Sequence, residues 1–167
     1  MDQGGTAVRL RPPRERLDAR AVGWWRTQWL VALLVLAGIP ALLGLLIEPA
    51  RFWLLLAAAV LGGPCLIGGL VFPSWWFRVH RWEVTDEAVY VRTGAFWQEW
   101  RIAPMSRIQT VDTLRGPLER YFGLATLTVT TASSQGPVKI VGLGHETAAE
   151  LAERLTLITR ATAGDAT

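Results

Sequence analysis

Residues 116–131 read GPLERYFGLATLTVTT, and the second half of this stretch alternates between apolar side chains and threonines. Ala125, Leu127 and Val129 fall on one side of an extended chain, and the threonines fall on the other. This period of two predicts a half-buried β-strand that follows a Gly-Pro turn. Such a strand belongs to a sheet domain in water, whereas most of the preceding half of the chain is too apolar for water. The sequence therefore joins a small sheet domain to a segment of another kind.

Two runs without a charged side chain, 27–47 and 52–77, fill the apolar part of the chain. A helix needs about 20 apolar residues to cross the hydrocarbon core of a bilayer, and both runs are long enough. They are apolar on every side, which favours membrane spans over the buried helices of a soluble protein. Only Glu48-Pro49-Ala50-Arg51 separates them. We therefore expect a two-helix transmembrane hairpin over 27–77, with spans at about 29–47 and 52–72.

Small residues recur four apart in the second run. This spacing lets helix backbones approach closely, so this face packs either on the first run or on another protein. Pro40 and Pro64 are expected to kink the helices, and Pro73 is expected to end the second one. The pairs at this spacing are Ala58 with Gly62, Ala59 with Gly63, and Cys65 with Gly69.

The distribution of arginines predicts the orientation of the hairpin. Six arginines precede the first run, and Arg78 and Arg81 follow the second, whereas the turn between the runs has one arginine balanced by one glutamate. Positive charge stays on the cytoplasmic side of a membrane, so we expect both chain termini in the cytoplasm. The net charge of +3 gives no reason to expect nucleic-acid binding.

Tryptophans mark the expected membrane boundaries, since six of the nine lie near the ends of the predicted spans. An indole has an apolar body and one N–H donor, which suits the headgroup region. Residues 1–26 are expected to form a basic tail, mobile over 1–20, that sets the orientation or contacts anionic lipid. The candidate membrane-interface residues are Trp24, Trp25, Trp29, Trp75, Trp76, Arg78 and Arg81.

After Phe77 the period of the apolar residues changes from helical to two, and short turn-like segments separate six predicted strands. Such short connections imply an antiparallel meander, because parallel strands need longer crossovers. The closing segment 145–160 has the apolar stripe of an amphipathic helix. A curved sheet followed by one such helix predicts a partly open barrel that the helix closes. The predicted strands are 77–84, 88–93, 97–103, 108–115, 124–131 and 137–143.

The region from residue 78 to about 160 also carries a set of spaced motifs. They are Arg92-x-Gly94, Ile102-Ala103-Pro104, Arg107-Ile108-Gln109-x-Val111, Gly116-Pro117-Leu118 and Arg120-x-Phe122-Gly123. With these motifs the sequence resembles the bacterial pleckstrin-homology-like (PH-like) membrane proteins, whose small members are similar in their two-helix hairpin too. The resemblance implies a PH-like antiparallel split barrel over 78–162, capped by the C-terminal helix, and a short tail at 163–167. Such folds normally have seven strands, and six are visible.

The resemblance implies no activity, since the family has no agreed chemistry. No nucleophile–base arrangement, metal-ligand spacing or phosphate-binding glycine loop is visible in the sequence either. We therefore expect a protein that is not an enzyme, with no catalytic residue, cofactor or metal. Phosphoinositide binding is disfavoured, because the acidic turn Thr85-Asp86-Glu87 would repel a phosphate. Arg81 and Arg92 flank this turn, which leaves weak headgroup contact open.

A polar set surrounds the Gly-Pro turn, and its candidate partner-binding or structural-corner residues are Arg107, Asp112, Arg115 and Arg120. As a recognition surface, the arginines would suit carboxylates or phosphates. As a structural corner, Arg120 would pair with Asp112 or Glu119 and lock residues 116–123 onto the barrel. We favour the structural interpretation, in which Pro117 and Gly123 set the backbone turns and Leu118 and Phe122 point inward.

The sequence thus predicts a multi-pass protein of the bacterial inner membrane with a PH-like interaction module. This module would dock a protein partner, or another copy of the chain, at the cytoplasmic face. Two alternatives stay open: a module that recognises anionic lipid headgroups, and an accessory subunit of an export or resistance system. Neither a nucleic acid nor a small-molecule substrate is expected.

Overall fold

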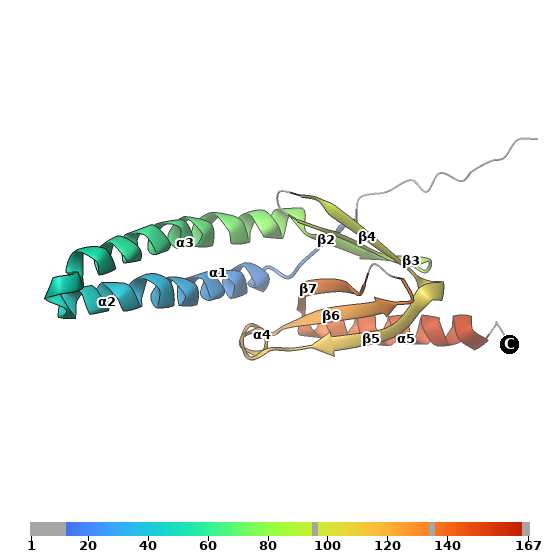
Figure 1. Ribbon diagram of the computed structural model, residues 1–167. Helices are drawn as coiled ribbons and strands as arrows, with labels where there is room; N and C mark the ends of the chain where they lie inside the picture. Colours follow the sequence, from blue (N-terminus) through green and yellow to red (C-terminus); the bar gives the residue numbers. More distant parts are fainter. Residues whose placement is uncertain (1–12, 95–96, 134–135, 165–167) are drawn as a thin grey trace, which may run out of the picture.

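Two long helices project from one end of a small β domain in the computed structural model (Figure 1). The structure describes residues 13–94, 97–133 and 136–164, with side chains up to Thr159. The helices run antiparallel and are joined by a single 3-10 turn. We call residues 20–79 the hairpin and the remaining described elements the domain. In chain order the hairpin contains α1 (Arg20–Leu33), the π-helical turn η1 (Leu34–Gly38), α2 (Ile39–Leu46), η2 (Glu48–Ala50) and α3 (Arg51–Val79).

Prolines disturb the two arms of the hairpin differently. Pro40 has no N–H, and its ring crowds the carbonyl of the residue four positions earlier, so the preceding turn opens into the π-helix η1. In contrast, α3 continues through both Pro64 and Pro73 and ends at Val79. The predicted helix end at Pro73 is therefore wrong, and the first strand after the hairpin begins at residue 81 rather than 77. The last turns of α3 are held because Trp76 and Phe77 pack against the core of the domain.

Small residues bring the two arms of the hairpin into close contact. A Cβ atom built on Gly62 would lie 2.7 Å from Ala37 Cβ, and one on Gly69 would lie 2.9 Å from Trp29 Cβ. A Cβ on Gly63 would meet nothing within 4 Å. The small face through Gly62 and Gly69 thus packs on the first arm, which decides between the two alternatives for these residues.

The domain is made of two antiparallel sheets and two helices, and it includes all six strands predicted after the hairpin. One sheet has the order β1 (Glu15–Arg16), β2 (Arg81–Val84), β3 (Ala88–Thr93) and β4 (Glu99–Pro104). The other has the order β5 (Ile108–Leu114), β6 (Leu124–Thr131) and β7 (Val138–Gly144). The remaining elements are η3 (Met105–Arg107), α4 (Pro117–Phe122) and α5 (His145–Gly164).

The seventh strand comes from before the hairpin. In β1, Glu15 pairs with Trp82 and Arg16 with Arg81, so residues on both sides of the hairpin join one sheet. Leu17, two residues from the strand start, is buried in the core. The predicted mobile tail is therefore wrong for residues 13–20, because this segment is fixed by strand pairing and by burial. Residues 1–12 of the predicted tail lie outside the described residues.

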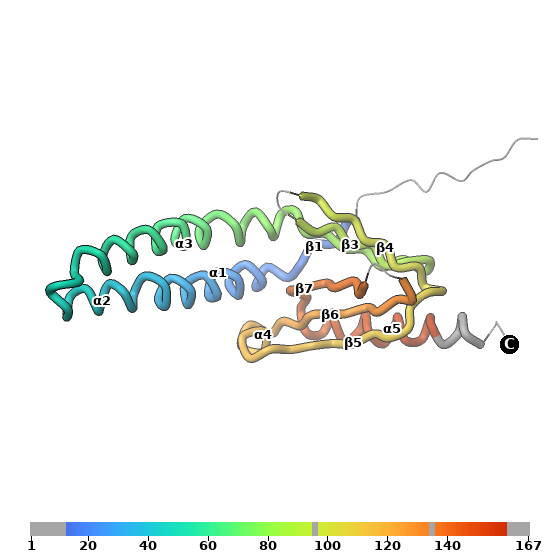
Figure 2. The backbone as a smooth tube through the Cα atoms, viewed as in Figure 1, coloured from blue at the N-terminus to red at the C-terminus, as the bar shows by residue number. Residues whose placement is uncertain are grey.

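The core lies between the two sheets and α5, which runs along the β5–β6–β7 sheet (Figures 1 and 2). The alternating strand β6 supplies Ala125, Leu127 and Val129, all of them buried, but Thr126 and Thr131 are buried as well, so the strand is covered more fully than the predicted half-buried strand. The predicted stripe of the closing helix is confirmed, since Ala148 and Leu155 are fully buried against the sheets. Gly142, at φ +83°, allows α1 to approach β7, because a Cβ there would lie 3.0 Å from Ala21 Cβ.

Candidate membrane and docking interface

The end of the domain that carries the hairpin gathers basic, aromatic and exposed apolar side chains. In Figure 1 the start of α1, the end of α3 and the helix α4 all lie at this end. The β2–β3 turn and the C-terminal end of α5 lie at the opposite end. We call the first the near end and the second the far end.

An aromatic cluster joins the two arms of the hairpin to the domain. Trp29 stacks on Phe72 with ring centroids 5.9 Å apart, and Phe72 stacks on Trp75 at 6.2 Å. Trp25 meets the edge of Trp76 at 5.9 Å. Trp25 is also buried in the domain core, so its indole packs inside the protein rather than against lipid headgroups. The predicted interface role is therefore wrong for Trp25, whereas Trp24, Trp29, Trp75 and Trp76 remain partly exposed.

A hollow of about 570 Å³ opens beside this cluster, between the hairpin and the domain. Trp97 lies on its domain side and is 88% exposed. His80 also lines it, and burial among aromatic rings lowers the pKa of this imidazole below its usual value of 6.5. The other lining residues are Trp25, Trp29, Phe72, Trp76, Gly94 and Val141.

Three arginines form a row across the first sheet at the near end. Arg16 lies opposite Arg81 in the strand register, and Arg81 lies opposite Arg92. Side chains opposite one another in antiparallel strands point to the same face. Arg92 in turn lies opposite Trp100, with its guanidinium carbon 5.8 Å from the ring centroid. We call Arg16, Arg81 and Arg92 the arginine row.

The helix α4 forms the predicted corner but is stabilised by a different residue from the one expected. The buried carboxylate of Glu119 accepts a hydrogen bond from the Gly116 N–H at 2.6 Å and one from the Thr126 hydroxyl at 2.7 Å. A glutamate at the third helical position reaches back to the first amide in this way. Pro117 starts the helix, and Gly123 ends it at φ +66°, as predicted.

The predicted pairing of Arg120 is wrong. The next residue on a helix is rotated by about 100°, so Arg120 points to the solvent while Glu119 points inward. Within the described residues neither Asp112 nor Glu119 forms an ion pair with it, and Asp112 instead accepts a hydrogen bond from Thr110. The corner is therefore held by the Glu119 carboxylate inside the domain and not by Arg120 on its surface.

The outer side of α4 is apolar and exposed. Tyr121 is 84% exposed, and Leu118, three residues before it, and Leu114, at the end of β5, are exposed as well. Leu118 was expected to point inward, and the structure contradicts this. Phe122 is partly buried as predicted and packs against α1, where a Cβ on Gly23 would lie 3.2 Å from its ring. The exposed apolar side of α4 therefore lies beside the first turns of the hairpin.

The four arginine and aspartate candidates of the polar set do not form one site. Arg107, in η3, and Arg115, after β5, are eight residues apart along a strand that rises about 3.3 Å per residue, which separates them by about 25 Å. Arg115 donates a hydrogen bond from Nε to the Leu124 carbonyl at 3.2 Å, so it closes the corner. Arg107 is exposed at the start of β5.

The entry of the chain into the hairpin is fixed by backbone and charge. The Asp18 N–H donates to the Gly142 carbonyl at 3.1 Å, which extends the domain up to α1. The Asp18 carboxylate accepts hydrogen bonds from Arg20, whose guanidinium holds the pKa of this carboxyl below its usual value of 3.8. Sequence reasoning missed this entry, although Leu17, Ala21 and Trp25 recur every four residues as on one helix face.

Comparisons with known proteins agree with this architecture. A family model described as "Bacterial PH domain" matches residues 22–157, which include most of the hairpin and most of the domain, but not β1. The UPF0699 transmembrane protein YdbS of Bacillus subtilis (strain 168) is 29% identical over 161 residues, which cover 92% of this chain and 97% of that protein. No solved structure gives a significant match. In the described part of the chain, no group of three His, Cys, Asp or Glu residues is placed to hold a metal ion.

Proposed function

Since this chain belongs to the bacterial PH domain family, we propose that it is a membrane-anchored docking module. The hairpin spans the inner membrane, both termini lie in the cytoplasm, and the domain is held in one orientation on the cytoplasmic face. The module acts by binding a protein partner or a second copy of the chain, and not by catalysis.

The exposure of the hairpin supports the membrane span. The two helical segments, Arg20–Leu46 and Glu48–Val79, are long and apolar, yet only 6% and 17% of their most apolar stretches are buried. The core helix of a soluble protein would be mostly buried. The related YdbS is itself named a transmembrane protein. An apolar surface of this size is stable in lipid and costly in water.

The lengths of the two segments support the same placement. At 1.5 Å per residue, 27 and 32 residues span about 40 and 48 Å, which exceeds the roughly 30 Å of hydrocarbon. The additional turns lie at the near end, where Trp25 and Trp76 pack into the domain. The basic residues Arg78 and Arg81 follow directly, as the positive-inside rule requires on the cytoplasmic side.

The observation that carries the proposal is the double attachment of the domain. Only Leu17, Asp18 and Ala19 separate β1 from α1, and only His80 separates α3 from β2. A domain attached at two points, with Trp25 of α1 inside its core, cannot swing freely. The exposed apolar side of α4 lies at the same end and suits the headgroup region, where Tyr121 would place its hydroxyl in water.

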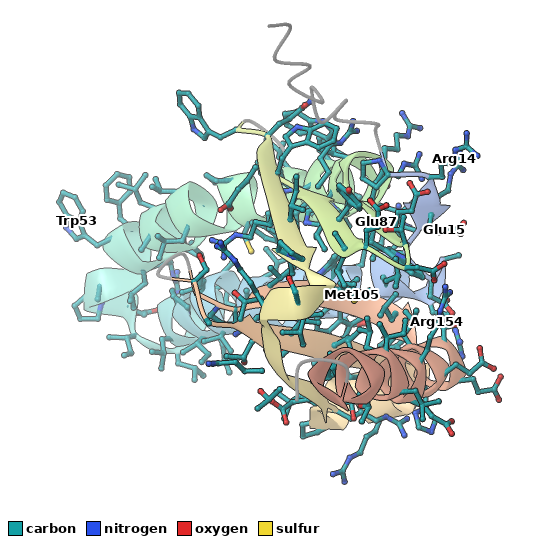
Figure 3. All side chains as sticks on the ribbon, turned by 90° about the vertical axis from the view of Figure 1, so that its right-hand side faces the viewer. Arg14, Glu15, Trp53, Glu87, Met105 and Arg154 are labelled. Atoms are coloured by element: carbon teal, nitrogen blue, oxygen red, sulfur yellow. The ribbon has the colours of Figure 1, made fainter. Side chains whose placement is uncertain are left out.

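A fixed orientation always presents the far end to the cytoplasm. Figure 3 looks onto this end, with Met105 near its centre and Glu87 and Arg154 toward its right-hand side. Its exposed groups include an acidic turn in which Asp86 pairs with Arg154 at 2.8 Å. Charged, solvated groups of this kind at the rim of an interface favour specificity and association rate over raw affinity.

The topology is tested by cysteine labelling in intact cells. In a Cys65→Ala background, Pro49→Cys is expected to react with a membrane-impermeant thiol reagent, and Ala163→Cys is expected to react only after the cells are opened. Labelling of position 163 in intact cells would contradict the proposed orientation. Protection of both positions until the cells are opened would contradict the membrane span.

The docking end is tested by placing a photo-crosslinking residue at Glu87 or at Tyr121 of the full chain in its native membrane. We expect a protein adduct of constant mass at position 87, reduced by an added Asp86→Arg substitution, and phospholipid adducts at position 121. A protein adduct at 121 together with none at 87 would show that the docking face is at the near end.

A further inference from the structure

The arginine row places three like charges side by side. The pairs Arg16–Arg81 and Arg81–Arg92 are direct partners in antiparallel strands. The Cβ atoms of such partners lie about 4.5–5.5 Å apart, and like charges at this spacing destabilise a sheet. A sheet that keeps three of them in register needs a counter-charge.

The described residues do not supply this counter-charge. Their ion pairs join Asp18 to Arg20, Glu48 to Arg51, Glu99 to Arg101 and Asp86 to Arg154, and none includes the arginine row. Glu83 is the next residue on the same face of β2, where it lies opposite Tyr90. Glu15 lies opposite Trp82 in the register and so belongs to the other face. The charge of the row is therefore uncompensated within the described part of the chain.

Arg81 shows the imbalance most directly. Its side chain is partly exposed, but its Nη1 atom is buried and has no hydrogen-bond partner in the described structure. Burial, and then the charges of Arg16 and Arg92, lower the pKa of Arg81 from its usual value. Arg92 has one donor engaged, from Nε to the Val79 carbonyl at 3.2 Å. An anion with several acceptor oxygens would both satisfy these free hydrogen-bond donors and neutralise the neighbouring positive charges.

A fourth arginine and a hollow complete the site. Arg78, in the last turn of α3, lines a space of about 340 Å³ together with Arg16, Phe77 and Arg81. The lining of this space thus includes three arginines and one phenylalanine. Arginine is the residue best suited to phosphate, because its planar fork donates two parallel hydrogen bonds.

We propose that Arg16, Arg78 and Arg81 bind the phosphate of an anionic phospholipid in the cytoplasmic leaflet, with Arg92 adding positive charge beside Arg81. The inference rests on the proposed membrane hairpin, because the second apolar segment ends at Val79, within three residues of both Arg78 and Arg81. The site is then at headgroup depth, where an anionic lipid reaches it without leaving the bilayer.

Lipid retention by the full-length protein tests the site. The protein is purified from nanodiscs of mixed phosphatidylcholine and phosphatidylglycerol, and the lipids that remain bound are counted by native mass spectrometry. We expect selective retention of phosphatidylglycerol, reduced about fivefold by Arg81→Gln and more than tenfold by Arg16→Gln with Arg81→Gln. Arg107→Gln, with the same charge change at the far end, is the matched control and should retain lipid as the parent does.

Thermal unfolding separates lost binding from lost folding. In neutral detergent without added lipid, Arg81→Gln should melt at or above the temperature of the parent protein, because one repulsive charge has been removed. Added phosphatidylglycerol should raise the melting temperature of the parent and not that of the variant. A variant that melts lower than the parent in neutral detergent would show that the row is satisfied within the protein, and would overturn the proposal.

Four further outcomes would overturn the assignment. Equal retention of the two lipids, or unchanged retention in Arg81→Gln, would remove the phosphate site. Stabilisation by inorganic phosphate equal to that by phosphatidylglycerol would assign the site to a free anion, and stabilisation by a polyglutamate peptide alone would assign it to an acidic protein. None of these results would change the labelling expected at positions 49 and 163. Failure of the lipid site is therefore distinguishable from failure of the membrane anchor.

Discussion

In the hairpin, Leu34 and Leu46 are each 71% exposed, whereas in the domain Leu124 and Leu127 are fully buried. The two regions use the same residue type and differ in what surrounds it. The domain removes its leucines from water by folding, and the hairpin removes few of its own by helix packing. The exposed leucines of the hairpin therefore favour an apolar surrounding, such as the proposed bilayer, over water. The border between the hairpin and the domain is the aromatic cluster around Trp25 and Trp76.

The largest difference in stability between the two regions is expected when a buried leucine is truncated. Leu127→Ala should lower the free energy of unfolding by about 2–5 kcal/mol, since it removes packing and leaves a cavity. Leu34→Ala should change it by about 0.5 kcal/mol or less, because that side chain faces detergent in the folded protein. Unfolding in detergent, followed by tryptophan fluorescence, measures both. Equal losses would mean that the hairpin is buried against another protein surface.

Within the domain, a buried and an exposed side chain of the same short helix can be compared. Glu119→Ala should cost about 1–3 kcal/mol, because it leaves the Gly116 N–H and the Thr126 hydroxyl without the acceptor that they share. Arg120→Ala, one residue away and exposed, should cost about 0.5 kcal/mol or less. The melting temperatures of the two variants measure these losses. A larger loss in Arg120→Ala than in the Glu119 variant would show that Arg120 stabilises the corner.

Glycines in α3 test the packing of the hairpin by itself. Gly62→Ala brings a methyl group against Ala37 and should destabilise the hairpin by about 1 kcal/mol net, after the gain in helix propensity is deducted. Gly63→Ala, where the space is open, should stabilise it by up to about 1 kcal/mol. Unfolding by increasing dodecyl sulfate compares them. Identical effects would indicate that the arms do not touch at Gly62.

The smallest effect is expected at the border, from pH. Burial lowers the folded-state pKa of His80, so the neutral imidazole is the form that folding favours. Its contribution to stability is present above pH 6.5, the unfolded value, and is lost as pH falls toward the lowered pKa. The melting temperature should decline on acidification from pH 7 to 5, and His80→Gln should flatten this decline. His145→Gln, which removes an exposed imidazole, is the matched control.

Much of the fold could be read from periodicity, because the alternation of residues in strands such as β7 and the apolar stripe of α5 follow their burial. The seventh strand could not, since two residues in β1 carry no period and their partner lies across the hairpin. The end of α3 was misplaced because Pro73 reads as a stop, while packing of Trp76 and Phe77 holds the helix beyond it. Local propensity yields to tertiary contacts at both places.

The candidate site could be predicted only in part. Tryptophans and arginines from the ends of the apolar runs lie together at the near end, but Trp25 proved to be buried. Arg16 escaped notice because its position beside Arg81 depends on the strand pairing. The roles of Glu119 and Arg120 were exchanged because a one-residue difference on a short helix decides which side chain points inward.

The pairing of β1 with β2 also has a consequence for the order of synthesis. Arg16 accepts the indole N–H of Trp82 on its carbonyl, although the two residues are 66 positions apart in the chain. A ribosome adds about 5–20 residues per second, so β1 waits for several seconds before its neighbour emerges. In the proposed membrane, the two strands can meet only after both helices have been inserted and the chain has returned to the cytoplasm. In that membrane, β1 and β2 therefore pair only when both helices are correctly inserted. A chain that inserts only one helix would keep an unpaired strand edge, which quality-control proteases could cleave.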